Sequence, residues 1–227
     1  MILGVIPARL HSTRFPSKVI FPLKGKPIIE HVYEKALQSN LLNKVIVAVD
    51  SEETKNVINC PNVIMTSDKH QSGTDRVAEV ANKFDCDVVV NIQGDEPGID
   101  PLLIDQLIKL FEDPRVEMAS IASTDLKEDD LNNDNVVKVN LDKKNNAISF
   151  IRNNLNSDLT YYRHIGIYAY RKNTLNLFTS LTQSDNEKNH RLEQLRALDN
   201  NIAIKLLISD FSHRIIDVKE NLKNYEN

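Results

Sequence analysis

The sequence contains little cysteine. Its 227 residues include only two, Cys60 and Cys86. Two cysteines cannot build the disulfide framework that stabilises many small secreted proteins, so the chain is expected in the reducing cytoplasm. Both are interpreted as packing residues, because free cysteine is among the most frequently buried residue types.

Long apolar runs and an excess of positive charge are also missing. No stretch reaches the roughly 18 consecutive apolar residues that a membrane-spanning helix requires. The opening MILGVI is too short for the core of a signal peptide. The formal net charge of −4 argues against a nucleic-acid partner, because nucleic-acid-binding domains are normally basic. We therefore expect neither a membrane nor a nucleic acid among the partners of this chain.

Glycine is scarce, with six residues, and the glycine-rich phosphate loops are absent. Neither the pattern G-x-x-x-x-G-K-[ST] nor the dinucleotide fingerprint G-x-G-x-x-G occurs in the chain. A phosphate site in this protein would therefore depend on cationic and hydroxyl side chains.

Short β-branched runs alternate with amphipathic stretches in the first half of the chain. Strands are predicted at residues 2–6, 44–50 and 63–67 and from residue 87 onward. Helices are predicted at residues 26–39, 51–60 and 73–84. This alternation is typical of a mostly parallel sheet flanked by helices.

The pattern changes near residue 118, where strands follow one another at short intervals. Strands are predicted within MASIAST, NVVKVNLDKKNNAISFI and HIGIYAYR, and polar loops at residues 126–135 and 153–158. A helix at residues 190–201, strands at 202–209 and 213–218 and a closing helix at 219–227 complete the prediction. Close spacing of strands favours antiparallel pairing. We expect one domain over residues 1–227, a three-layer α/β fold with an antiparallel appendage around residues 120–172.

A dense basic segment, VIPARLHSTRFPSK, follows the first predicted strand. Arg9, Arg14 and Lys18 fall within ten residues, and a loop that keeps such cations together is suited to an anion. Ser12 and Thr13 add hydroxyl donors. Because open parallel sheets bind ligands at the carboxyl ends of their strands, the segment predicts a triphosphate site. The alternative is a solvated loop whose charges face water.

Acidic residues follow two other predicted strands. In NIQGDEP, Asp95 and Glu96 come just after a buried strand, and Asp217 ends the run HRIID. Mg²⁺ prefers a few carboxylates together with phosphate oxygens and water. Asp95 and Asp217 are therefore candidate Mg²⁺ ligands. A lone aspartate at the end of a strand is otherwise a turn former or a helix cap.

The segment HQSGTDR offers polar groups beside a glycine that permits close approach of the backbone. Gln71, Ser72, Gly73 and Arg76 are candidate contacts for a ligand. Ser72 through Asp75 also form a plausible helix N-terminus, so part of this segment could serve for capping alone.

These segments, together with RHIGIYAYR, LEQLRAL and IDVKENL, resemble the 3-deoxy-manno-octulosonate cytidylyltransferases, or CMP-Kdo synthetases, over nearly the whole chain. The resemblance implies a Rossmann-like nucleotidyltransferase fold, an appendage used for dimerisation and sugar binding, a homodimer and a requirement for Mg²⁺. It implies transfer of CMP from CTP to the anomeric hydroxyl of 3-deoxy-D-manno-octulosonate (Kdo), with release of pyrophosphate, for lipopolysaccharide biosynthesis.

The resemblance extends and assigns the candidate residues. The expected nucleotide-binding residues are Arg9, Ser12, Arg14, Lys18, Gln71, Ser72, Gly73, Arg76, Gln93 and Asp95. The expected catalytic residues are Arg9, Lys18 and Asp95, and the expected metal ligands are Asp95 and Asp217. The expected sugar-binding residues are Arg152, His164, Tyr168, Glu193 and Gln194. Without the resemblance, His164 would be interpreted as structural.

Two segments depart from the family pattern. Family members usually have Gly-Thr-Gly-Val-Asp-Thr where this chain has SHRIIDV, so His213 and Arg214 replace small residues before Asp217. They commonly have Ser-Arg-x-x-Ile-Pro and a longer loop before the histidine, where this chain has FIRNNLNSDLTYYRH, which keeps Arg152. Both departures fall where the sugar is expected. An alternative substrate is therefore 8-amino-Kdo or another 2-keto sugar acid.

Two other classes of function are weighed against this prediction. A glycosyltransferase of related fold would favour an Asp-x-Asp metal motif, which the run Asp95-Glu96-Pro97 does not provide. A nucleotide-sensing module with a degraded site would not need to keep Arg9, Lys18 and both aspartates.

Overall fold

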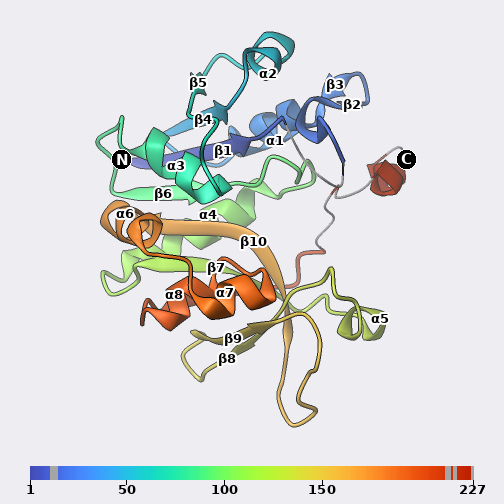
Figure 1. Ribbon diagram of the computed structural model, residues 1–227, viewed down its shortest axis with the longest axis vertical. Coiled ribbons are helices and arrows are strands. Elements are labelled where there is room, and N and C mark those ends of the chain that lie inside the picture. The colour runs from blue at the N-terminus through green and yellow to red at the C-terminus, as the bar shows by residue number, and fades with distance from the viewer. Residues whose placement is uncertain (11–14, 213–215, 217–218, 226–227) are drawn as a thin grey trace. The chain divides into compact units, whose positions relative to one another are not determined.

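The computed structural model describes residues 1–10, 15–212, 216 and 219–225 (Figure 1). The chain forms two compact units. The first contains residues 1–105 and the C-terminal segment 214–227, and the second contains residues 106–213. This division into compact units does not test whether residues 1–227 form the single domain expected from the sequence, which stays a prediction.

Parallel strands form the sheet of the first unit, in the order β6-β1-β4-β5. They are β1 (Ile2–Ala8), β4 (Lys44–Val49), β5 (Val63–Met65) and β6 (Val88–Asn91). A small antiparallel pair, β2 (Pro22–Leu23) and β3 (Lys26–Pro27), lies outside this sheet. Because β1 runs parallel to both β4 and β6, the residues that follow these three strands lie at one edge of the sheet.

Helices flank the sheet of the first unit (Figure 1). They are α1 (Ile28–Ala36), α2 (Glu52–Val57), α3 (Gly73–Ala81), the 3₁₀ helix η1 (Lys18–Ile20) and the first part of α4 (Pro101–Lys109). The three helices predicted here are confirmed, with shorter bounds. Ser51 caps α2, accepting a hydrogen bond from the backbone N of Thr54 at 3.1 Å. Pro27 occupies the N-cap position of α1, one residue before the first turn.

The C-terminal segment belongs to the first unit. The strand predicted at residues 213–218 lies outside the described residues except for Ile216, and the predicted closing helix is the 3₁₀ helix η3 (Lys219–Tyr225). Ile216 is wholly buried in a cluster with Phe15, Leu23 and Ile28, against which Leu222 and Tyr225 pack. Apolar packing thus joins the end of the chain to the segment that follows β1.

The second unit contains the strands predicted between residues 118 and 171 and the strand predicted at residues 202–209. They are β7 (Met118–Ser123), β8 (Lys138–Leu141), β9 (Ala147–Ile151), β10 (Tyr162–Arg171) and β11 (Ile204–Ser209). β10 runs antiparallel to β7 and β8, and β8 runs antiparallel to β9, which confirms the antiparallel pairing expected around residues 120–172. β11 pairs with β7 in parallel.

The helices of the second unit were predicted less well. They are η2 (Leu110–Glu112), α5 (Glu128–Leu131), α6 (Lys172–Ser180), α7 (Asp185–His190) and α8 (Leu195–Asp199), with the last part of α4. The loop predicted at residues 126–135 contains α5. The helix predicted at residues 190–201 is wrong at its start, because Arg191 has a φ of 53° and ends α7, so α8 begins only at Leu195.

Among the helices that the structure describes, none combines the length and the apolar character needed to cross a membrane.

Glu79 of α3 holds the segment that connects β5 to α3. Its Oε2 accepts hydrogen bonds from the backbone N of Ser67 at 2.9 Å and from His70 Nε2 at 2.7 Å. Its Oε1 accepts from Lys83 Nζ at 3.1 Å. Burial alone would raise the pKa of Glu79, but the three hydrogen bonds outweigh it and lower the pKa to about 2.

Replacing this carboxylate should produce a pH-dependent loss of stability. We expect Glu79→Gln to lower the free energy of unfolding by roughly 1 to 2 kcal/mol at neutral pH, allowing for solvent screening. The loss is full above the unfolded pKa of 4.5 and disappears as the pH falls toward the folded value of about 2. Urea unfolding at neutral and acidic pH measures it. The matched control is Glu53→Gln on the exposed face of α2. If Glu79→Gln were equally destabilised at every pH, the lowered pKa of Glu79 would not be the cause of the loss.

Candidate functional site

A buried lysine and an aspartate meet where β1 and β6 end. Lys18, at the start of η1, is only 7 % exposed, and its Nζ lies 2.5 Å from Asp95 Oδ2. Asp95 follows β6 by a few residues, and its side chain is 27 % exposed. A buried ammonium needs such a partner, because removing an unpaired charge from water is costly. Two predicted catalytic residues, separated by 77 positions in the sequence, therefore lie together.

Gly94 allows the chain before Asp95 to pass close to β1. A Cβ atom at residue 94 would lie 3.0 Å from the backbone oxygen of Pro7, closer than most real contacts. The glycine is needed for this approach to β1, and its φ is not in the left-handed region.

The C-terminal segment reaches the same place. The backbone N of Ile216 donates a hydrogen bond to the backbone oxygen of Asp95 at 3.1 Å. Ile216 immediately precedes Asp217 in the sequence, but Asp217 itself lies outside the described residues, as do Ser12 and Arg14. The predictions made for these three residues stay predictions.

Arg9 joins the end of β1 to the segment before α3. Its side chain is exposed, and its Nη1 donates to the backbone oxygen of Gln71 at 3.5 Å. Ser72 is the N-cap of α3, where its Oγ accepts from the backbone N of Asp75 at 3.1 Å and its backbone N donates to Asp75 Oδ2 at 3.0 Å. Asp75 is therefore a capping residue, one of the two interpretations left open by the sequence. Gly73 packs its backbone near Pro7.

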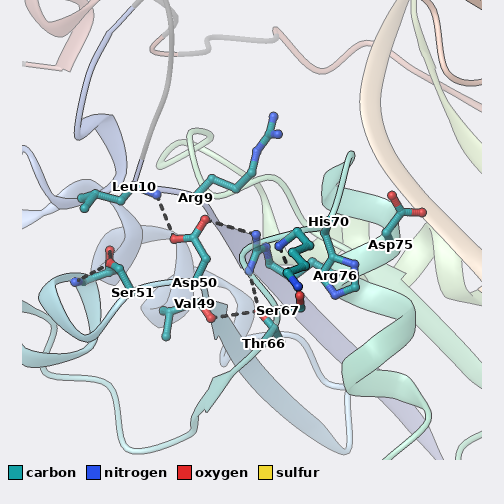
Figure 2. A network of polar contacts seen from close by, with 12 residues as sticks. Arg9, Leu10, Val49, Asp50, Ser51, Thr66, Ser67, His70, Asp75 and Arg76 are labelled. Carbon is teal, nitrogen blue, oxygen red and sulfur yellow. Dashed lines mark hydrogen bonds and ion pairs between the residues drawn. The ribbon is translucent and has the colours of Figure 1, made fainter.

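Arg76 lies beneath the surface in a polar network (Figure 2). Its side chain is 0 % exposed, its Nη2 donates to Asp50 Oδ2 at 3.1 Å, and its Nη1 donates to Thr66 Oγ1 at 2.5 Å. This arrangement does not offer the direct nucleotide contact predicted for Arg76, because no part of the guanidinium reaches solvent. Sequence reasoning missed Asp50, although it follows a buried strand as Asp95 does.

Gln93 lies between Asp95 and the end of β6. Its Nε2 donates to Asn91 Oδ1 at 3.1 Å, and Asn91 Nδ2 donates to Thr74 Oγ1 at 3.5 Å. Buried amide and hydroxyl groups thus connect the residues after β6 to the first turn of α3. In the first unit, the described nucleotide-binding candidates lie on the segments that follow β1 and β6 or at the start of α3.

His164, a predicted sugar contact, lies on β10 in the second unit. It is 8 % exposed, and its Nε2 lies 2.9 Å from Ser120 Oγ on β7. The ring centroids of Phe150 and Tyr168 lie 5.0 and 5.5 Å from that of His164. The pairing of β7 with β10 shifts register just after Ile165, and such irregularities redirect side chains. Ser120 was not found from the sequence, since a strand serine gives no signal of its own.

Tyr168 is largely buried, and this burial raises its pKa well above the usual value near 10, with the charge of Glu193 acting in the same direction. The Oε1 atom of Glu193 lies 3.8 Å from Arg196 Nη2. Arg196 in turn makes hydrogen bonds of 2.6 and 2.8 Å to the two carboxylate oxygens of Glu187. Gln194, the next residue in the sequence after Glu193, is buried. Glu193 thus lies beside a buried ion pair, and Gln194 is itself buried.

Arg152 follows β9 and is held by backbone oxygens. Its Nη1 donates to Asp134 at 2.9 Å and its Nη2 to Arg191 at 3.4 Å. The wholly buried Lys138 donates from Nζ to the backbone oxygens of Asn133, at 2.9 Å, and of Arg152 itself. All five predicted sugar contacts therefore belong to the second unit.

The carboxylate of Asp95 is of the kind that a divalent cation needs as a ligand. Within the parts of the chain that the structure describes, no three His, Cys, Asp or Glu side chains form a cluster that could hold a metal alone. Mg²⁺ usually binds through one or two carboxylates and completes its shell with phosphate oxygens and water. A partly exposed carboxylate beside a cationic, phosphate-compatible segment fits this requirement.

Comparisons with known proteins identify the family of this chain. A family model described as "Cytidylyltransferase" matches residues 3–206. The 3-deoxy-manno-octulosonate cytidylyltransferase of Trichlorobacter lovleyi is 38% identical over 97% of this chain and 95% of its own length. That of Chloroherpeton thalassium is 42% identical over 96% and 93%, respectively.

A solved structure shares the fold. It is that of a CMP:2-keto-3-deoxy-manno-octonic acid synthetase complexed with CTP, which is 33% identical and superposes with a TM-score of 0.91 over 98% of this chain and 95% of that one. The nucleotidyltransferase α/β fold predicted from the sequence is thereby confirmed. The chain belongs to the 3-deoxy-manno-octulosonate cytidylyltransferase family.

Proposed function

We propose that this chain transfers CMP from CTP to the anomeric hydroxyl of Kdo and releases pyrophosphate, forming CMP-Kdo for lipopolysaccharide biosynthesis. The observation that carries the proposal is the 2.5 Å pair between Lys18 and Asp95 at the carboxyl ends of neighbouring parallel strands, in a chain of this family. The pair brings together a cation for phosphate and a carboxylate for a metal ion.

Lys18 and Arg9 would stabilise the triphosphate. The attacking hydroxyl displaces pyrophosphate from the α-phosphorus, so negative charge builds up on the β- and γ-phosphates. Lys18 is fixed in a largely buried position, where electrostatic interactions are stronger than in water. A positioned donor of this kind is worth about 3 kcal/mol of transition-state stabilisation. Arg9, at the exposed end of β1, adds a guanidinium that can grip phosphate oxygens in bidentate fashion.

Asp95 would hold Mg²⁺, with Asp217 proposed as its second ligand. When bound, the ion neutralises phosphate charge and polarises the α-phosphate. Lys18 keeps the Asp95 carboxylate oriented, and the backbone bond from Ile216 fixes the main chain of the same residue. The fit between this partly exposed carboxylate and the ligands that Mg²⁺ prefers supports the proposal.

Arg152, His164, Tyr168, Glu193 and Gln194 would receive the sugar. Kdo is an anion through its carboxylate, and Arg152 supplies positive charge close to the end of β9. The Ser120 hydroxyl fixes the His164 ring, which lies beside Tyr168. The homodimer and the cytoplasmic location implied by the resemblance stay proposals that family membership supports.

Pyrophosphate release distinguishes the candidate functions. We expect release from CTP only when Kdo is also present, because the sugar hydroxyl is the nucleophile. Turnover of 8-amino-Kdo with no turnover of Kdo would show that the proposed sugar substrate is wrong and that the proposed cytidylyl transfer is right. Release of a nucleoside phosphate from a nucleotide sugar would indicate a glycosyltransferase, and CTP binding without turnover on any acidic sugar would indicate a sensing module.

Removing the Lys18 ammonium should slow the reaction strongly. We expect Lys18→Ala to lower kcat/KM by about 100-fold, since a well-placed charged donor to the leaving pyrophosphate is lost. Steady-state kinetics measure this, with thermal unfolding to show that the variant is folded. Lys26→Ala, which removes an exposed lysine paired with Glu34, is the matched control. Near-wild-type kinetics of a folded Lys18→Ala variant would contradict the proposed contact between Lys18 and the phosphates.

Metal dependence should be tied to Asp95. We expect a chelator to abolish turnover and Mg²⁺ to restore it. Asp95→Asn should raise the Mg²⁺ concentration needed for half-maximal activity by at least about tenfold, because a neutral amide is a weaker ligand than a carboxylate. Asp68→Asn, an exposed aspartate of the same unit, serves as control. Full activity of the chelated wild-type chain would contradict the proposed cofactor.

A further inference from the structure

Asp50 connects the end of β1 to α3 (Figure 2). It follows β4, the neighbour of β1 in the parallel sheet. One carboxylate oxygen, Oδ1, accepts a hydrogen bond from the backbone N of Leu10 at 3.1 Å. The other, Oδ2, accepts from Arg76 Nη2 at 3.1 Å. A single carboxylate thus fixes both the backbone just beyond β1 and a side chain from the first turn of α3.

The guanidinium of Arg76 is fixed at both of its terminal nitrogens. While Nη2 donates to Asp50, Nη1 donates to Thr66 Oγ1 at 2.5 Å, and the Thr66 hydroxyl donates to the backbone oxygen of Val49 at 2.8 Å. Val49 is the last residue of β4 and directly precedes Asp50. Two routes therefore tie Arg76 to the carboxyl end of β4, which leaves little freedom to the first turn of α3.

Stability alone does not explain this pair. Burial lowers the pKa of Arg76, Asp50 raises it, and the positive charge of Arg9 lowers it again. In addition, the buried Nε of Arg76 has no hydrogen-bond partner. Buried ion pairs of this kind often add no net stability over apolar residues of similar size, because the desolvation penalty offsets the attraction. Because the Arg76–Asp50 pair carries this desolvation penalty, we explain it by the positions in which it holds the end of β1 and the start of α3.

The two segments that Asp50 and Arg76 connect both carry proposed nucleotide contacts. Leu10 directly follows Arg9, at the start of the basic segment. Arg76 lies on the helix whose start is formed by Ser72 and Gly73, and Arg9 itself reaches the backbone oxygen of Gln71 at 3.5 Å. The spacing between the end of β1 and the start of α3 therefore sets the spacing between the proposed triphosphate contact of Arg9 and the proposed nucleotide contacts of Ser72 and Gly73.

We propose that Asp50 and Arg76 are positioning residues that set the spacing between the proposed triphosphate contact at the end of β1 and the proposed nucleotide contacts at the start of α3. They act through Leu10, Arg9 and α3, without touching the nucleotide. The inference rests on the proposed function in that it takes CTP as the ligand. A rigid spacing of this kind favours nucleotide binding because less conformational freedom is lost when the ligand is bound.

The test compares CTP affinity with sugar kinetics in Asp50→Asn. Its amide keeps the shape of the side chain but loses the charge that pairs with Arg76. We expect the Kd for CTP, measured calorimetrically with Mg²⁺ and no sugar, to rise about tenfold. The KM for Kdo at saturating CTP should change by less than about twofold, since the sugar contacts belong to the second unit. Amide hydrogen exchange at Leu10 should become faster.

Arg76→Lys serves as the second variant, in case Asp50→Asn does not fold. Lysine keeps the charge but cannot hold Asp50 and Thr66 in the fixed geometry of a guanidinium. We expect an increase of about threefold in the Kd for CTP.

The matched control is Asp105→Asn. Asp105 is another buried carboxylate of the first unit that holds backbone amides, those of Asn40 and Leu41, at 3.1 Å each. This variant should lose thermal stability with no change in CTP affinity. Unchanged CTP affinity in folded Asp50→Asn and Arg76→Lys, or an equal loss in Asp105→Asn, would overturn the positioning role.

The wild-type chain separates this inference from the proposed function. If it binds CTP but releases no pyrophosphate with any acidic sugar, the proposed function is wrong, and the positioning role is judged by CTP affinity alone. If it does not bind CTP, both are wrong.

Discussion

The parallel pairing of β1 with β4 on one side and β6 on the other is the constraint on which the first unit depends. Parallel strands end at the same edge of a sheet, so the chain leaves three neighbouring strands within a small region. Arg9, Asp50 and the Gly94–Asp95 turn occupy those three positions. Their chemistry differs, but each is placed by the strand before it, which is held by a ladder of backbone hydrogen bonds.

Buried cations are a second common element of the described structure. Four basic side chains are largely removed from solvent: Lys18, Arg76, Lys138 and Arg196. Each bonds to oxygen atoms on another segment of its own unit, namely carboxylates for three of them and backbone carbonyls for Lys138. Because losing one partner of such a pair leaves an uncompensated charge, these contacts specify the conformation of loops that would otherwise be free to vary.

The strands and the basic segment could be predicted from the sequence, because strong alternation and strand-end positions are local signals. The family resemblance singled out Asp95. Asp50 has the same position after a strand as Asp95, but an isolated aspartate there is usually a turn former, so nothing distinguished it. The polar run of α7, Asp185–His190, has no apolar periodicity and was missed. Ser120 and the register shift after Ile165 arise from pairing between distant strands, which a single sequence does not reveal.

The course of the last residues has a consequence for biosynthesis. Ile216 completes the apolar cluster around Phe15 and Ile28 and donates to the backbone of Asp95, so the first unit is assembled from both ends of the chain. During translation the ribosome still holds this C-terminal stretch when all of the second unit has been synthesised. The first unit can therefore reach its final form only after the whole of the second unit has been synthesised, whereas the second unit is free to fold earlier.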